Sequence, residues 1–189
     1  MPVADLSNLI HSLAGQSSTA DALARFAAND VVYFAIFVIA WLFLRLPSLR
    51  PSLAAVTAAL VAVALAALIG TVYYVARPFV VEHFTPLIQH AADASFPSDH
   101  LAAMGAVVAA AWMVARRLAL ATAAASFVVA FARVYVGVHW VTDVAGGFVL
   151  GLVCGVIAWR LYAFADEWAP PFDPVLRKWH LRPDIRAGG

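Results

Sequence analysis

Charged residues are scarce in this chain. They make up 12% of its 189 residues, whereas roughly a quarter of an ordinary soluble domain is charged, and 64% of the residues are hydrophobic. This composition excludes an ordinary soluble domain and is typical of a protein that lies in a membrane. The net charge is only +1 and the sequence has no stripe of basic residues, so no nucleic-acid-binding surface is expected.

Cysteine is almost absent, since Cys154 is the only one. A single cysteine forms no disulfide within the chain and provides no paired thiols for a redox site or a cysteine–metal site. The His, Asp and Glu residues also lack the close ligand spacing of a metal site. We therefore expect a protein that works without a metal ion or another cofactor.

Long uncharged runs predict an all-α, polytopic transmembrane helical bundle of five to six spans. The run between Arg50 and Arg77 is longer than the roughly 20 apolar residues that cross a bilayer, whereas the last three runs are shorter. Arginines at the ends of short runs extend to the headgroup region, which allows such runs to span. The candidate spans are residues 28–46, 51–76, 101–115, 118–132 and 144–159.

These runs divide the chain into three parts. Residues 28–165 form the predicted transmembrane domain. Residues 1–27 mix charged and apolar positions, which fits either an interfacial helix or a weak additional span. Residues 166–189 are rich in proline, tryptophan and arginine, and they predict a cytoplasmic tail.

Basic residues alternate between the connections and set the orientation, because Lys and Arg beside spans are retained in the cytoplasm. Nine of the twelve follow the first, third or last span: Arg45, Arg50, Arg116, Arg117, Arg160, Arg177, Lys178, Arg182 and Arg186. The intervening connections hold Glu82, His83, His90, Asp93, Asp99, His100, His139 and Asp143. We therefore expect a multi-pass inner-membrane protein with its polar site on the periplasmic or extracellular side.

Three short segments on that side carry groups suited to phosphate: Arg77-Pro78-Phe79, Phe96-Pro97-Ser98-Asp99-His100, and Arg133 to Asp143. Arg77 and Arg133 can each bind phosphate oxygens through two N–H groups. Ser98 suits the N-cap of the third span, and the backbone N–H groups of Asp99 and His100 would then point toward an anion. Two arginines and a helix start predict a phosphate-binding site.

His139 and Asp143 are four residues apart. On a helix that begins near His139, the carboxylate would contact one ring nitrogen and fix the tautomer. The other ring nitrogen would be free to attack phosphorus, and histidine is among the side chains that form covalent intermediates. His100, from the other segment, is then available as the general acid for the departing oxygen.

The order RP, PS-x-H and R-x5-H-x3-D, at the ends of consecutive spans, resembles the type-2 phosphatidic acid phosphatase superfamily. Within it, the stretches RPFVVEH, QHAADASFPSDH and RVYVGVHWVTDVAGG resemble bacterial undecaprenyl-diphosphate phosphatases of the bacitracin-resistance type. The resemblance implies hydrolysis of undecaprenyl diphosphate to undecaprenyl phosphate, the carrier lipid of peptidoglycan synthesis. It also implies that His139 is the nucleophile that forms a phosphohistidine, oriented by Asp143, with His100 as acid. The implied phosphate binders are Arg77, Ser98 and Arg133.

Three positions depart from the superfamily pattern, which has Lys at position 70, Ser at position 132 and Gly at position 99. This chain has Gly70, Ala132 and Asp99 there. Gly70 and Asp99 also resemble the bacitracin-resistance type. Asp99 would repel a phosphate unless it pairs with an arginine or faces the hydrolytic water. Because it lies between Ser98 and His100, we still include Asp99 among the expected phosphate-binding residues.

Other functions fit the same residues at this point. A phosphatase of another lipid, such as phosphatidylglycerophosphate, phosphatidate or lipid A, would use the same chemistry. A lipid transporter or lipid-binding protein would use the Arg, His and Asp residues as a relay or a pocket, without releasing phosphate. Glu82 and His90 are expected at the rim of the site, in contact with the substrate headgroup.

Overall fold

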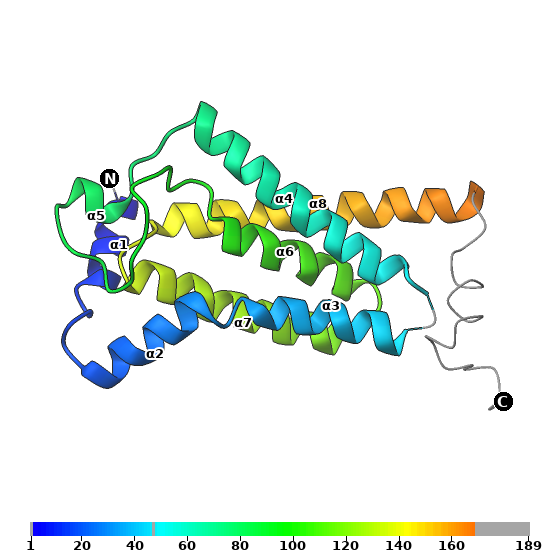
Figure 1. Cartoon of the computed structure of the whole chain (residues 1–189), viewed down its shortest axis with the longest axis horizontal. Helices are drawn as coiled ribbons and strands as arrows, with labels where there is room; N and C mark the ends of the chain where they lie inside the picture. Colours follow the sequence, from blue (N-terminus) through cyan, green and yellow to red (C-terminus); the bar gives the residue numbers. More distant parts are fainter. Residues whose placement is uncertain (1, 47, 169–189) are drawn as a thin grey trace.

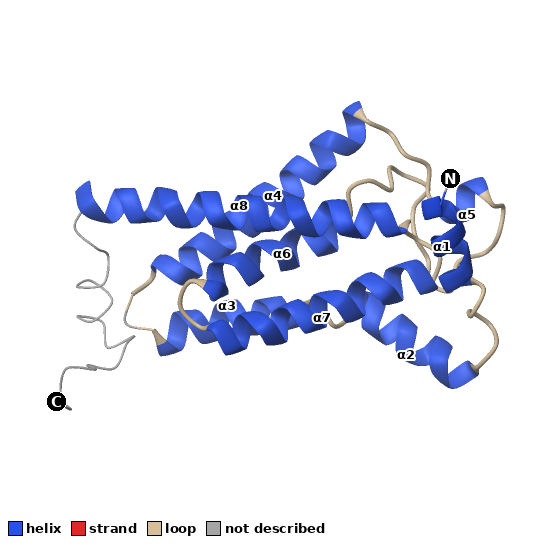
Figure 2. Cartoon of the chain, turned by 180° about the vertical axis from the view of Figure 1, so that it is seen from behind, coloured by secondary structure: helices blue, strands red, loops and turns tan. Residues whose placement is uncertain are grey.

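The computed structural model describes residues 2–46 and 48–168, and the regular secondary structure in this part of the chain is all helical. Eight helices follow one another along it (Figures 1 and 2), which confirms the all-α prediction. They are α1 Pro2–His11, α2 Ser18–Asn29, α3 Tyr33–Arg45, α4 Arg50–Val72, α5 Pro78–Val81, α6 Asp99–Trp112, α7 Arg116–Tyr135 and α8 Val141–Trp168. The predicted tail falls mainly on residues 169–189, outside the described residues.

Three segments are long and apolar enough to cross a membrane, namely Arg50–Val72, Arg116–Tyr135 and Val141–Phe164. Helices α2 and α3 pass the same test only together, as a pair bent by 45°. Helix α6 is apolar but has only 14 residues. The described residues therefore contain three helices that meet this test, or four spans if the bent pair counts as one, whereas five to six spans were predicted. The predicted segment 101–115 falls short because α6 has only 14 residues, and the predicted segment 28–46 passes only when α2 is joined to α3.

Helix α6 lies at the centre of the bundle and packs against α4, α7 and α8 (Figure 1). Glycines permit the closest of these contacts. A Cβ atom at Gly151 of α8 would overlap the backbone carbonyl of Ala102 in α6, and one at Gly147 would overlap the carbonyl of Ser98. The small residues therefore allow the two backbones to approach closely and hold the starts of α6 and α8 side by side.

The amino-terminal segment packs along the end of the bundle that carries the polar connections. Helix α1 contacts α7 and α8, and the backbone N–H of Val141, at the start of α8, donates to the Ser7 hydroxyl at 3.0 Å. The His11 ring nitrogen lies 2.8 Å from the carbonyl oxygen of Tyr135, at the end of α7. Helix α2 packs against α7 and leads into α3. Sequence alone left the placement of residues 1–27 open, and the structure assigns them two helices against the bundle.

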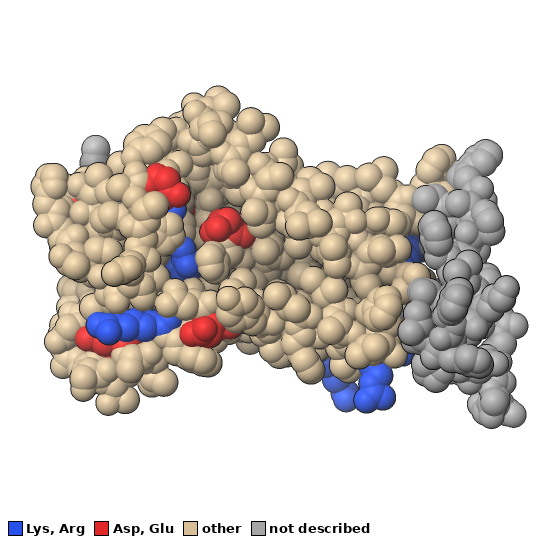
Figure 3. All heavy atoms as spheres, viewed as in Figure 1, with Lys and Arg blue, Asp and Glu red and all other residues tan. Residues whose placement is uncertain are grey.

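The two polar connections, residues 73–98 and 136–140, meet at one end of the bundle (Figure 1). The backbone N–H of Ser98 donates to the Asp143 carbonyl at 3.0 Å, and that of Leu87 donates to the Val136 carbonyl at 3.0 Å. On the face seen in Figure 3, an uncharged belt separates the charged side chains at this end from those at the other. The predicted gathering of the two connections is confirmed.

Candidate active site

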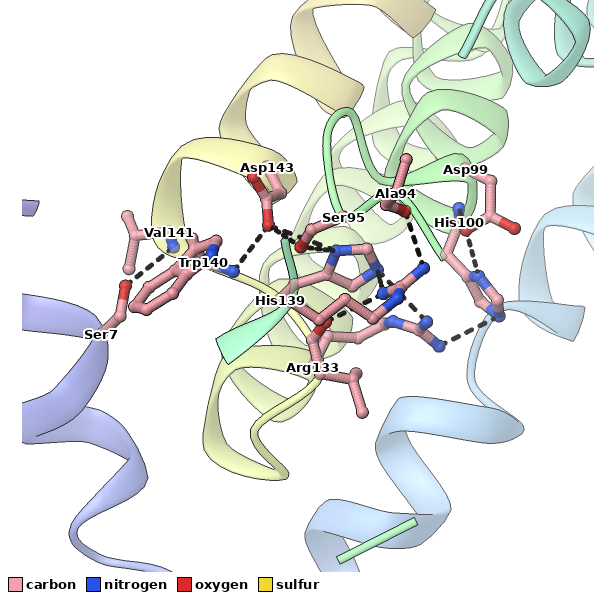
Figure 4. A network of polar contacts seen from close by, with 12 residues as sticks. Ser7, Ala94, Ser95, Asp99, His100, Arg133, His139, Trp140, Val141 and Asp143 are labelled. Atoms are coloured by element: carbon pink, nitrogen blue, oxygen red, sulfur yellow. Dashed lines mark hydrogen bonds and ion pairs between the residues drawn. The ribbon is translucent and has the colours of Figure 1, made fainter. Parts of the chain in front are cut away.

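His139 lies in the short connection between α7 and α8 and is 1% exposed. Its Nε2 atom is 3.3 Å from Arg133 Nη2 (Figure 4). The same atom is 3.4 Å from Arg77 Nη1. Guanidinium nitrogens only donate hydrogen bonds, so Nε2 is the accepting, unprotonated ring nitrogen and Nδ1 carries the proton. The Nε2 lone pair is therefore directed toward the space between two arginines.

The His139 imidazole is neutral in this environment. Burial, together with the charges of Arg133 and Arg77, lowers the pKa of His139 to about 4, although the Asp143 carboxylate acts in the opposite direction. A neutral imidazole keeps the lone pair that a nucleophile needs. The arrangement thus favours attack by His139 Nε2 on an electrophile held by the two arginines.

Asp143 lies in the first turn of α8 and is fully buried. Its Oδ2 atom is 3.5 Å from His139 Nδ1, which is longer than the usual N–H···O distance of about 2.9 Å. The same oxygen accepts the backbone N–H of Trp140 at 2.7 Å and a short hydrogen bond from the Ser95 hydroxyl. The predicted pairing of His139 with Asp143 is therefore present as a contact of 3.5 Å between a neutral imidazole and a carboxylate.

Ser95 is a site residue that the sequence did not single out. Its side chain is fully buried, and its Oγ atom lies 3.5 Å from His139 Nδ1 while donating to Asp143 (Figure 4). The hydroxyl thus stands beside both groups. Its position three residues before Ser98, in the same polar segment, is the only sequence signal that points to it.

Arg77 is held in place by the loops around it. Its Nε donates to Asp93 at 2.8 Å, Nη1 donates to the Val138 carbonyl at 2.9 Å, and Nη2 donates to the Ala94 carbonyl at 3.0 Å. The side chain is buried. Because Arg77 ties the 73–98 connection to the 136–140 connection, it is both a cation at the site and a structural link.

Arg133, in the last turn of α7, is 2% exposed. Its Nη1 donates to the Ala28 carbonyl at 3.3 Å and lies 3.4 Å from His100 Nε2. Its Nε atom is buried and has no hydrogen-bond partner among the described residues. This guanidinium therefore has one unused N–H, at Nε, while its Nη1 and Nη2 atoms lie against His100 and His139.

His100 lies in the first turn of α6, beside Asp99. The Asp99 Oδ1 atom is 2.9 Å from His100 Nδ1 and also accepts the His100 backbone N–H at 2.8 Å. We expected that backbone N–H to be free for a bound anion, and this expectation is wrong. The Asp99 carboxylate already occupies the helix start, and it orients the His100 ring so that Nε2 faces Arg133.

Ser98 occupies the predicted N-cap position of α6, but its hydroxyl makes no capping hydrogen bond. The predicted side-chain cap is therefore wrong. The Oγ atom is buried and has no hydrogen-bond partner within the described residues. A buried hydroxyl without a partner is costly, and a phosphate oxygen would satisfy it.

The two residues expected at the rim lie in different places. His90 Nε2 is 3.1 Å from Arg133 Nη2, and the His90 and His139 ring centroids are 6.2 Å apart, so His90 lies inside the site. Glu82 is exposed at the end of α5. Between them, the backbone N–H of Leu87 donates to the Val136 carbonyl at 3.0 Å, so the segment returns to the bundle before His90.

A cavity of about 520 Å³ leads to this site. Its apolar wall is formed by one side of α4, including Val63, Ala66 and Gly70, and it ends at Arg77 and His139. Within the described residues, no group of three or more His, Cys, Asp or Glu side chains is placed to hold a metal ion. Asp93, which pairs with Arg77, and Asp99 also line this end. A cavity with an apolar wall that ends at Arg77 and His139 suits a lipid that ends in a phosphate.

Known proteins share both the sequence pattern and the fold. The family model described as the PAP2 superfamily matches residues 51–167. Undecaprenyl-diphosphatase BcrC of Bacillus subtilis (strain 168) is 33% identical over 170 residues, which cover 89% of this chain and 86% of that protein.

Two solved structures, each 20% identical to the chain, are also similar. LpxE of Aquifex aeolicus has a TM-score of 0.69 and covers 85% of this chain and 96% of that one. A transmembrane PAP2 type phosphatidylglycerolphosphate phosphatase from Bacillus subtilis has a TM-score of 0.65 and covers 89% of this chain and 87% of that one. At this identity the likeness concerns the fold. Together with the sequence match, it shows that the chain belongs to the PAP2 superfamily and is a multi-pass membrane phosphatase.

Proposed function

We propose that the chain hydrolyses undecaprenyl diphosphate to undecaprenyl phosphate and inorganic phosphate, through a phosphohistidine on His139. The reaction would take place on the outer side of the bacterial cytoplasmic membrane and would recycle the carrier lipid of envelope synthesis. No cofactor takes part. The observation that carries this proposal is the convergence of two guanidinium groups on the unprotonated Nε2 of His139, at the end of an apolar-walled cavity.

In the first step, His139 Nε2 attacks the terminal phosphorus. The N–P bond forms with the Nε2 lone pair, the bond from phosphorus to the bridging oxygen breaks, and its electron pair stays on the departing lipid phosphate. Arg77 and Arg133 neutralise charge on the phosphoryl oxygens. The imidazole ring becomes positive while Nδ1 keeps its proton, and Asp143, 3.5 Å away, stabilises that charge.

His100 is suited to carry protons in both steps. As an imidazolium it donates its Nε2 proton to the departing oxygen, and the Asp99 carboxylate, 2.9 Å from Nδ1, stabilises the charged ring. In the second step, water attacks phosphorus and passes a proton to His100. The N–P electron pair returns to His139, and inorganic phosphate leaves.

The substrate is tested by phosphate release from purified protein in detergent. The panel contains undecaprenyl diphosphate, phosphatidylglycerophosphate, phosphatidate and lipid A, at matched concentrations. We expect the highest kcat/KM for undecaprenyl diphosphate. A higher kcat/KM for another lipid would make that lipid the preferred substrate. The absence of phosphate release from all four lipids would favour a transporter or binding protein.

Activity should survive removal of divalent cations. The two guanidinium groups and the Ser98 hydroxyl supply the positive charge and donors that a metal ion would otherwise provide. We expect purified protein dialysed against a chelator to keep its full rate of phosphate release. A rate that disappears on chelation and returns with one divalent ion would contradict the metal-free site.

The orientation is testable with single cysteines in a chain that carries Cys154→Ala. Glu82 and Arg117 are both exposed, at opposite ends of the bundle. A membrane-impermeant maleimide should label Glu82→Cys in intact cells and label Arg117→Cys only after the membrane is permeabilised. The reverse pattern would place the site on the cytoplasmic side.

A further inference from the structure

Three histidines surround the guanidinium of Arg133. His90 Nε2 lies 3.1 Å from Arg133 Nη2, and His139 Nε2 lies 3.3 Å from the same nitrogen. His100 Nε2 lies 3.4 Å from Nη1. The proposed mechanism gives chemical roles to His139 and His100, and it leaves His90 without one.

The ring of His90 is oriented by its own loop. Its Nδ1 atom lies 3.2 Å from the Ala91 carbonyl oxygen, to which only a protonated nitrogen can donate. Its Nε2 therefore faces Arg133 as an acceptor. Burial lowers the pKa of His90, and the charge of Arg77 lowers it further, so the ring is neutral while no anion is bound.

An attacked phosphoryl group would change these contacts. Its phosphorus lies in line with His139 Nε2, and one of its oxygens accepts from Arg133 Nη2, at a typical distance of about 2.8 Å. That nitrogen is 3.1 Å from His90 Nε2, so an oxygen bound on the side of Nη2 that faces His90 would lie within reach of the ring. A phosphoryl oxygen beside the ring favours the imidazolium, whose Nε2 proton then points at the anion.

We propose that His90 is a third cationic ligand of the phosphoryl group that is transferred to His139, together with Arg77 and Arg133. This inference rests on the proposed phosphatase reaction and adds a specific residue to it. The ligand is the phosphoryl group itself, so the contact is common to diphosphate and monophosphate lipids.

A positioning role makes a different prediction. If His90 only held Arg133 as a hydrogen-bond acceptor, a neutral side chain with an oxygen in place of Nε2 would serve as well. If His90 is a cationic ligand, a lysine replaces it better. His90→Gln and His90→Lys therefore separate the two roles, and His90→Ala removes both.

The test measures orthovanadate, an analogue of the transferred phosphoryl group, on purified full-length protein in detergent. We expect His90→Ala to weaken vanadate binding by about 10- to 100-fold, as measured by titration calorimetry and by inhibition of turnover. The kcat/KM values for lipid diphosphate and lipid monophosphate should fall by similar factors. His90→Lys should restore most of the affinity, and His90→Gln should not.

His83→Asn is the matched control, because His83 lies exposed in the same loop and its φ of 55° is a conformation that asparagine tolerates. It should bind vanadate within about twofold of the unaltered chain. Unchanged affinity in His90→Ala, or equal rescue by Gln and Lys, would overturn the proposal. Calorimetry needs no turnover, so a chain that binds vanadate through His90 but releases no phosphate from any lipid would refute the proposed function alone.

Discussion

Replacing His139 by alanine is expected to abolish phosphate release from every lipid substrate, with a loss of more than about 1,000-fold in kcat, as expected when a covalent nucleophile is removed. The imidazole is buried, its Nε2 atom faces both arginines, and the proposed mechanism assigns the attack to no other side chain. The measurement is phosphate release from undecaprenyl diphosphate by purified protein.

Two controls accompany this variant. The thermal unfolding temperature in detergent shows whether His139→Ala keeps its fold, and vanadate binding shows whether the arginines still hold an anion. Asp143→Asn should retain the oxygen that accepts from Trp140 and Ser95 while losing the negative charge, so it should be slower than the unaltered chain but faster than His139→Ala. Substantial turnover by a folded His139→Ala protein would assign the nucleophile elsewhere.

Replacing His100 by alanine should damage hydrolysis of a lipid monophosphate far more than hydrolysis of a lipid diphosphate. The group that leaves a diphosphate is a phosphate monoester, whose second pKa is about 6, so it departs readily without a proton. The group that leaves a monophosphate is an alkoxide, comparable in basicity to hydroxide, since water has a pKa of about 15.7. A general acid contributes roughly 100- to 10,000-fold, and that benefit falls as the leaving group improves.

This prediction is measured as kcat/KM on undecaprenyl diphosphate and undecaprenyl phosphate. It is distinct from the prediction for His90→Ala, which should affect both substrates alike. Asp99→Asn is the control for orientation, because Asp99 holds the His100 ring through Nδ1 and should give a weaker effect in the same direction. Equal losses on both substrates for His100→Ala would make His100 a phosphate ligand in place of the acid.

The alternation of spans made much of the site predictable. Helices that cross in turn bring every second connection to the same end, and this is why Arg77, Arg133, His100 and His139 could be placed together from sequence. Span ends were predicted less well. Cutting the apolar runs at charged residues gave 118–132 and 144–159, whereas the helices extend over Arg116–Tyr135 and Val141–Trp168. Arg133 and Asp143 lie inside α7 and α8. Both side chains face the buried polar site, so their charges do not require the helices to end there.

The connection formed by residues 73–98 is the part of the site whose contacts could not be predicted from the sequence. It has no hydrophobic period, so its side-chain directions depend on contacts with distant segments. Ser95 reaches Asp143, and His90 reaches Arg133, through a chain path that no local pattern describes. No local pattern predicted the contact of Asp99 either. Its carboxylate accepts the backbone N–H of His100, which was expected to bind an anion.

The stereochemical course at phosphorus tests the central claim, a phosphoryl group carried on His139, most directly. The substrate is a lipid diphosphate with a terminal thiophosphate made chiral by oxygen isotopes and hydrolysed in isotopically labelled water. Transfer to His139 and then to water inverts the configuration twice, so the account predicts net retention in the released thiophosphate. Net inversion would show a single displacement by water and would contradict a phosphohistidine intermediate.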